Sequence, residues 1–141
     1  MKRKGSAVWQ GSLKDGHGTV STDSGALSNN PYSFATRFEQ GAGTNPEELI
    51  AAAHAGCFSM ALSLALGEAG ITPERIATEA TVTIEPSDGG FAIPAVHLDV
   101  SAKIPGIDRE VFEEVANAAA TGCPVSKLLD AEITMDAQLE A

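Results

Sequence analysis

The feature that most constrains the fold of this chain is a run of 19 residues, 49–67, that contains no Lys, Arg, Asp or Glu. A helix of this length could span a membrane. The composition argues against that, because the run holds six Ala, two Gly, two Ser and a His, and Glu47, Glu48 and Glu68 stand at its ends. No basic loop flanks it to set an orientation. The run therefore predicts a buried core helix, and no membrane association is expected.

The ends of this helix are marked by capping residues. Asn45 can cap the first turn, Pro46 suits the first helical position and Glu48 has the spacing of a capping box. The helix should continue to about Ala69 and stop at Gly70. Small residues recur along it at spacings of three and four, which lets another backbone or helix approach closely. They are Ala52, Gly56, Ser59, Ser63 and Gly67.

The remaining patterns predict strands and two shorter helices. Alternating or β-branched stretches indicate strands at 6–11, 18–21, 32–38, 77–84, 95–104 and 133–139. Capping and stop signals indicate helices at 109–120 and 125–130. The order βββ-α-ββ-α-α-β is typical of an α+β fold with an antiparallel-leaning sheet. No repeat or linker divides residues 1–141, so a single domain is expected.

The charge balance restricts the partners of this protein. Nine basic residues against nineteen acidic ones give a formal net charge of −10. Such a chain repels nucleic-acid phosphates and anionic lipid headgroups, so neither is expected as a partner. The basic residues near the N-terminus are not followed by the apolar segment of a signal peptide. A cytoplasmic location is therefore predicted.

The two cysteines are the first candidates for chemistry. Cys57 lies in the middle of the long helix beside small residues, whereas Cys123 stands between Gly122 and Pro124, at a break between two helices. The free N–H groups of a first helical turn favour a thiolate at the second position. With two cysteines, a redox couple has one possible pairing, although both could also be buried as small apolar side chains.

Three other interpretations of these residues remain open. His54 and Cys57 share a helix face, so a metal site could form with Cys123, His17 or His97 as further ligands. A Cys–His hydrolase would use the same pair, but nothing nearby in the sequence indicates an oxyanion hole. A non-catalytic dimer that binds a small ligand or a protein is the third alternative.

A nucleophilic cysteine needs a cation beside it, because its pKa must fall from about 8.5 toward neutral. Arg37 is the leading candidate, flanked by Phe34 and Phe38 in a stretch that alternates like a strand. Glu47 or Glu48 could hold its guanidinium in a fork. On a straight helix, Glu47 and Cys57 would lie about 80° apart around the axis and about 15 Å apart along it. A site that uses both would require Arg37 to bridge them or a second subunit to complete it.

Several segments of the chain resemble one known protein family. They are residues 44–62, which read TNPEELIAAAHAGCFSMAL, and residues 120–126, which read ATGCPVS, together with shorter matches at 18–22, 36–38, 66–70, 105–108 and 131–134. These segments closely resemble the OsmC branch of the OsmC/Ohr family, which comprises osmotically inducible protein C and organic hydroperoxide resistance protein. The likeness extends over nearly the whole chain.

This resemblance implies an intertwined α+β homodimer with central long helices and two active sites at the subunit interface. It also implies a thiol peroxidase that reduces organic hydroperoxides preferentially, and hydrogen peroxide too, without metal, haem or flavin. By motif position, Cys57 is the peroxidatic cysteine and Cys123 the resolving one, and Arg37 with Glu47 activates the thiolate. No other cofactor is expected.

The chemistry of thiols then suggests the reaction sequence. Cys57 attacks the peroxide and becomes a sulfenic acid, and Cys123 condenses with it to form an intrasubunit disulfide. An external dithiol must reopen this disulfide, since the chain has no third cysteine. Ohr-type relatives use lipoylated proteins for this step. Phe34, Phe38 and Phe58 could form walls for an alkyl group, although core packing is the commoner role of such residues.

Overall fold

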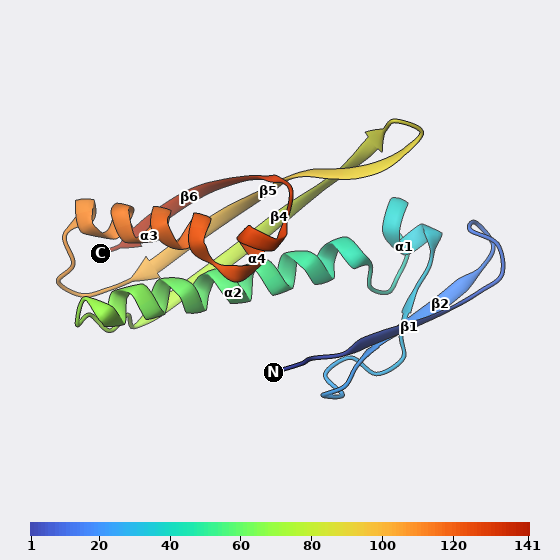
Figure 1. Cartoon of the computed structure of the whole chain (residues 1–141), viewed down its shortest axis with the longest axis horizontal. Helices are drawn as coiled ribbons and strands as arrows, with labels where there is room; N and C mark the ends of the chain where they lie inside the picture. Colours follow the sequence, from blue (N-terminus) through green and yellow to red (C-terminus); the bar gives the residue numbers. More distant parts are fainter. The chain divides into compact units, whose positions relative to one another are not determined.

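A computed structural model describes all 141 residues, and the chain divides into two compact units, residues 1–49 and residues 50–141. The strands are β1 (Gly5–Gln10), β2 (His17–Thr22), β3 (Asn30–Tyr32), β4 (Arg75–Ser87), β5 (Gly90–Lys103) and β6 (Glu132–Glu140). The helices are α1 (Phe34–Phe38), α2 (Pro46–Glu68), α3 (Arg109–Gly122) and α4 (Pro124–Leu128). The α+β class predicted from the sequence is confirmed (Figure 1).

The first unit is an antiparallel sheet followed by a short helix. Its strand order is β1-β2-β3, with β1 and β2 joined as the expected hairpin. Gly11, at a φ of +91°, and Gly16 lie in the connecting turn. A Cβ on Gly16 would clash with the Ser12 carbonyl oxygen, so the turn requires glycine there. The rings of Trp9 and Tyr32 pack across this sheet with centroids 5.3 Å apart.

The predicted strand at 32–38 is wrong beyond Tyr32, because the chain turns into α1. Ser33 caps this helix: its hydroxyl accepts a hydrogen bond from the Thr36 N–H, while the Thr36 hydroxyl accepts one from the Ser33 N–H. This reciprocal capping box starts a helix without a long apolar stripe. Phe34 and Phe38 are one helical turn apart, with ring centroids separated by 5.0 Å.

The second unit is built on a three-stranded sheet in the order β4-β5-β6. The pair β4 and β5 is antiparallel, whereas β6 runs parallel to β5 after the crossover through α3 and α4. The helices α2, α3 and α4 lie against one face of this sheet (Figure 1). Along β5 the side chains of Val96, Leu98, Val100 and Ala102 are buried at every second position, as alternation in a strand requires.

The long helix α2 supplies a central part of this core. It is long and apolar enough to cross a membrane by length and composition alone. Phe58, Leu62 and Leu66, spaced by four, are fully buried against the sheet, which confirms the prediction of a core helix. Asn45 accepts a hydrogen bond from the Glu48 N–H at its start, and Gly70 has a φ of +76° just beyond its end.

The small-residue stripe of α2 lies beside these core residues on the helix surface, and most of its members are exposed. A Cβ added to Gly56 or Gly67 would meet nothing within 4 Å, so these two positions of the stripe border open space. Ser59 is the exception, since its hydroxyl lies 2.8 Å from that of Thr78 on β4. The other four members of the stripe, Ala52, Gly56, Ser63 and Gly67, are exposed.

Candidate active site

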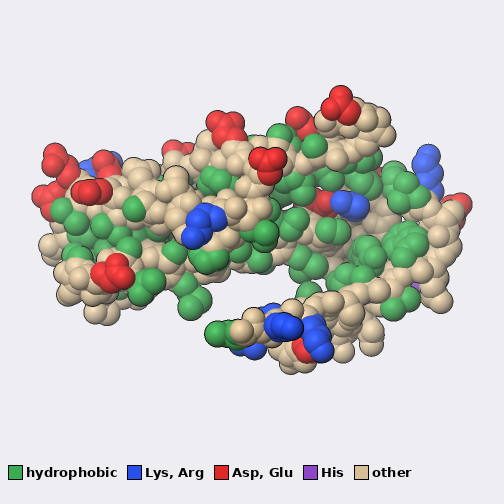
Figure 2. All heavy atoms as spheres, viewed as in Figure 1, with side chains coloured by type: hydrophobic (Ala, Val, Ile, Leu, Met, Phe, Trp, Pro, Cys, Tyr) green, Lys and Arg blue, Asp and Glu red, His purple; other side chains and the backbone are tan.

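Cys57 is partly exposed on α2, at the edge of a surface groove. The groove measures about 590 Å³, and apolar side chains of α2 and α3 form most of its lining. Met60 and Leu64, one and two turns further along α2, are 77% and 66% exposed beside it. Hydrophobic side chains gather over α2 and α3 in the space-filling view (Figure 2). A small reagent could therefore reach Cys57 from this groove.

Cys123 occupies the break between α3 and α4, as the sequence predicts, and is 1% exposed. Its own N–H donates to the Ala119 carbonyl at the end of α3, which leaves its side chain free to cap α4. The Cys123 sulfur accepts a hydrogen bond from the Ser126 N–H at 3.4 Å. A sulfur thus occupies the position that serine or aspartate oxygens usually take at a helix start.

The two cysteines, far apart in the sequence, meet in the structure. Both are free thiols, and the Cys57 and Cys123 side chains are hydrogen-bonded to each other. The Val125 N–H in the first turn of α4 also donates to the Cys57 sulfur. Hence a partly exposed thiol and a buried thiol lie in contact, which is the arrangement that a redox couple requires.

Burial is the largest effect on the Cys57 thiol, and it raises the pKa because the charged thiolate is less well solvated. The Val125 N–H acts in the opposite direction and lowers the pKa, while the Cys123 thiol raises it further. No cation is among the groups that shift this pKa. A reactive thiolate at Cys57 therefore needs a positive charge in addition to these neighbours.

Behind Cys123, a chain of hydrogen bonds leads into the core. The Ser126 hydroxyl lies 3.2 Å from the Cys123 sulfur and 2.7 Å from Nε2 of His54. His54 is fully buried, and burial lowers its pKa. The sequence patterns singled out His54 for metal or hydrolase chemistry but did not single out Ser126. Its position three residues after a capping cysteine is the signal that could have found it.

In the first unit, Arg37 and Glu47 form the ion pair that the sequence suggested. Nε and Nη2 of Arg37 lie 2.9 Å and 2.8 Å from the same carboxylate oxygen, Oε1 of Glu47. Glu47 is 8% exposed, and its Oε2 is buried without a hydrogen-bond partner. Glu48 is exposed and its N–H is held by Asn45, in line with a capping role. Glu47 is therefore the carboxylate that fixes the guanidinium.

Aromatic side chains surround the Arg37 end of this pair. Arg37 Cζ lies 5.2 Å from the centroid of the Phe38 ring, within range of a cation–π interaction. A pocket of about 250 Å³ in the same unit is lined by Trp9, Leu13, Tyr32, Ser33, Phe34, Arg37 and Phe38. Phe34 and Phe38 thus line a cavity, whereas Phe58 belongs to the core of the second unit.

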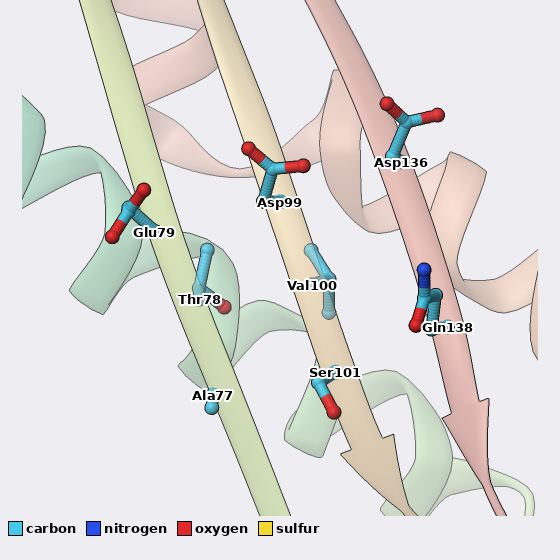
Figure 3. A pocket seen from close by; sticks show the side chains of 8 residues that line it. All are labelled: Ala77, Thr78, Glu79, Asp99, Val100, Ser101, Asp136 and Gln138. Carbon is cyan, nitrogen blue, oxygen red and sulfur yellow. The ribbon is translucent and has the colours of Figure 1, made fainter.

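Possible metal ligands gather elsewhere, on the exposed face of the second sheet. The ligand atoms of His97, Asp99 and Asp136 lie within 4.8 Å of one another, and Nε2 of His97 is 3.1 Å from Asp136. Glu79 pairs with Asp99 in the register, so carboxylates from three strands stand in a row over a hollow of about 450 Å³ (Figure 3). His97 belongs to this group of possible ligands. The metal site that the sequence left open, with His97 beside the cysteines, is therefore not formed.

Comparison with known proteins places the chain in a family. The model of the family "OsmC-like protein" matches residues 39–138. The chain is 56% identical over 141 residues to Peroxiredoxin OsmC of Escherichia coli K12, covering 100% of this chain and 99% of that protein. It is 35% identical over 124 residues to the organic hydroperoxide resistance protein OhrB of Bacillus subtilis, covering 87% and 89% of the two chains.

The solved structures agree with this assignment. The crystal structure of Bacillus subtilis OhrB covers 97% of this chain and 98% of its own, with a TM-score of 0.64 and 28% identity. An OsmC-like protein from Mycoplasma pneumoniae shares the fold, with a TM-score of 0.75 and 19% identity over 100% and 99% of the two chains. The chain belongs to the OsmC-like protein family.

Proposed function

We propose that the protein reduces hydroperoxides, organic ones in preference to hydrogen peroxide, in defence against oxidative stress. The chain is a thiol peroxidase, given its 56% identity along its whole length to a peroxiredoxin. The observation that carries the proposal is the contact between a partly exposed thiol, Cys57, and a buried one, Cys123. A peroxide can reach the first of these sulfurs, and the second is poised to react with the product.

In the proposed reaction, the Cys57 thiolate attacks the distal oxygen of the hydroperoxide. The O–O bond breaks, an alcohol leaves after taking up a proton, and the Cys57 sulfur becomes a sulfenic acid. Cys123 then condenses with this sulfenic acid, and water leaves as the disulfide forms. An external dithiol reopens the disulfide by thiol exchange, and a lipoylated protein is a suitable dithiol.

Arg37 is proposed to provide the positive charge that the Cys57 thiolate needs. The pKa of Cys57 is raised by burial, so the thiolate requires an opposing charge within a few ångströms. Arg37 is held by Glu47 through two hydrogen bonds, and this pairing restricts the guanidinium to few orientations. The aromatic pocket beside Arg37 suits the alkyl part of an organic hydroperoxide.

A homodimer is proposed as the active assembly. The α2 surface leaves Met60 and Leu64 exposed, and small residues such as Gly56 stand open beside them. An apolar helix face with glycines is well suited to close packing against a second copy of the same helix. Such a dimer would add a wall to the groove beside Cys57, through which the peroxide enters, and either subunit could then supply Arg37 and Glu47 to each site. The cytoplasm is the proposed location.

Rapid mixing of the reduced protein with tert-butyl hydroperoxide or hydrogen peroxide tests this function. We expect both thiols to disappear into a Cys57–Cys123 disulfide, faster with the organic peroxide, as followed by thiol counting and mass spectrometry. Cys57→Ser should abolish peroxide consumption, while Cys123→Ser should complete one turnover and retain a sulfenic acid. Two thiols that survive excess peroxide would refute the function and favour a non-catalytic binding role.

A further inference from the structure

The hydrogen bonds behind Cys123 form a continuous path from its sulfur to a buried imidazole. Ser126 links the two, with its hydroxyl 3.2 Å from the Cys123 sulfur and 2.7 Å from Nε2 of His54. The three residues are 1%, 8% and 0% exposed, so the path is shielded from solvent. Neither the peroxide-reducing step nor the Arg37–Glu47 pair uses this chain of groups.

His54 is an unusual residue for its position in the core. It lies on the same face of α2 as Phe58 and Leu62, where an apolar side chain would pack without any polar group to satisfy. Its Nδ1 is buried and has no hydrogen-bond partner, so the ring makes its one hydrogen bond to Ser126. A purely structural histidine would normally be satisfied at both nitrogens. The single bond directs the imidazole at Ser126.

We propose that Ser126 and His54 form a proton relay for Cys123 in the step that forms the disulfide. Ser126 contacts the reacting sulfur directly, and His54 acts through Ser126 as its positioning residue and proton acceptor. This inference rests on the proposed function, because Cys123 must lose its proton only once Cys57 carries a sulfenic acid. It assigns roles to two residues beyond the two thiols and the Arg37–Glu47 pair.

The proposed step balances in atoms and electrons. The Cys123 sulfur attacks the Cys57 sulfur, the S–S bond forms, and the S–O bond of the sulfenic acid breaks. The Cys123 proton passes to the Ser126 oxygen while the Ser126 hydroxyl proton passes to Nε2 of His54. Hydroxide leaves from Cys57, and the proton held by His54 returns through the Ser126 hydroxyl to this hydroxide, so that water is released and no net proton is gained or lost. Cys123 is oxidised and the Cys57 sulfur is reduced, so no external oxidant is needed.

Two properties of the surroundings suit this role. Burial lowers the pKa of His54, so the imidazole is neutral before the step and holds a proton only transiently during it. The Ser126 N–H donates to the Cys123 sulfur at 3.4 Å, so the same residue stabilises the negative charge that develops there. The site thereby separates the activation of Cys123 from that of Cys57.

Single-turnover kinetics with one equivalent of tert-butyl hydroperoxide can test the relay. Samples quenched over time and alkylated would be separated by mass spectrometry into thiol, sulfenic acid and disulfide forms. We expect His54→Gln, His54→Met and Ser126→Ala to form the sulfenic acid at the wild-type rate but the disulfide at least tenfold more slowly. His97→Gln, which changes a histidine on the exposed sheet face, should match the wild type in both steps.

The glutamine variant separates a relay from a merely structural role. Its amide can still hydrogen-bond to Ser126 but cannot take up a proton. If His54→Gln forms the disulfide at the wild-type rate while His54→Met forms it more slowly, His54 only positions Ser126 and the relay is overturned. A slowdown of both steps alike in all three variants would also overturn it. If the wild-type protein forms no sulfenic acid at all, the proposed function itself has failed.

Discussion

The two units of this chain are stabilised in different ways. All of the buried apolar side chains lie between Phe58 and Cys123, in the second unit. In the first unit the buried side chains are Thr36 and Glu47, which are polar, and β1 is exposed along most of its length. The hydrophobic effect therefore stabilises the unit that contains the thiols, while capping and ion-pair contacts organise the unit that contains Arg37. The comparison teaches that the two units differ in how much apolar surface they bury within one chain.

Truncation of apolar side chains in each unit should give the largest contrast. Phe58→Ala removes a fully buried ring and should lower the free energy of unfolding by about 3–5 kcal/mol. Val8→Ala in β1, where the side chain is 60% exposed, should lower it by less than about 0.5 kcal/mol. Urea denaturation followed by circular dichroism measures both values. A Val8→Ala loss as large as that of Phe58→Ala would mean that an apolar surface covers β1.

The second contrast compares an arginine from each unit. If Arg37 supplies the charge that we propose for the Cys57 thiolate, Arg37→Ala should slow the alkylation of Cys57 by iodoacetamide at pH 7 roughly tenfold or more, because less of the thiol would be ionised. Arg75 also forms an ion pair, with Glu140, but it is exposed and belongs to the second unit. Arg75→Ala should leave the alkylation rate unchanged. Equal rates for Arg37→Ala and the wild type would exclude Arg37 from the site.

Removal of a helix cap in each unit should change the free energy of unfolding by less than the loss of a buried ring. Asn45→Ala should cost about 1 kcal/mol of the free energy of unfolding, since Asn45 caps α2. Asn45 also donates from Nδ2 to the Thr36 carbonyl at 3.0 Å, a contact that joins α1 to the start of α2. Asp108 caps α3 without such a contact, so Asp108→Ala should cost less. Asn45→Asp keeps the cap but loses the contact of the amide with the Thr36 carbonyl. If its free energy of unfolding equals that of the wild type, this contact contributes nothing to stability.

The pH dependence of the second unit should show the smallest effect. Burial lowers the pKa of His54 in the folded chain, so the unfolded chain binds a proton there at a higher pH. The free energy of unfolding therefore falls as the pH drops below the ordinary histidine value, by less than about 1 kcal/mol between pH 8 and pH 6. In urea titrations, the free energy of unfolding of His54→Gln should fall less over this pH range than that of the wild type. An identical loss in both proteins would contradict a lowered pKa of His54.

Much of the local structure could be predicted because its signals are local. The bounds of α2 followed from Asn45 and Gly70, and the cap of α3 followed from Asp108. The error at 32–38 also has a local origin. Phe34 and Phe38 are four residues apart, a spacing compatible with the period of a strand and with one turn of a helix. The capping box of Ser33 and Thr36 stabilises the helix at this position.

The sequence by itself determined the number of thiols, the acidic charge, the α+β class and the break between helices that holds Cys123. It could not determine which polar groups meet, because His54 and Ser126 are 72 positions apart and their contact depends on how α4 packs on α2. The same holds for the contact of Cys57 with Cys123. Short-range capping rules act within one turn of a helix, whereas these contacts form only when buried apolar surfaces bring distant helices together.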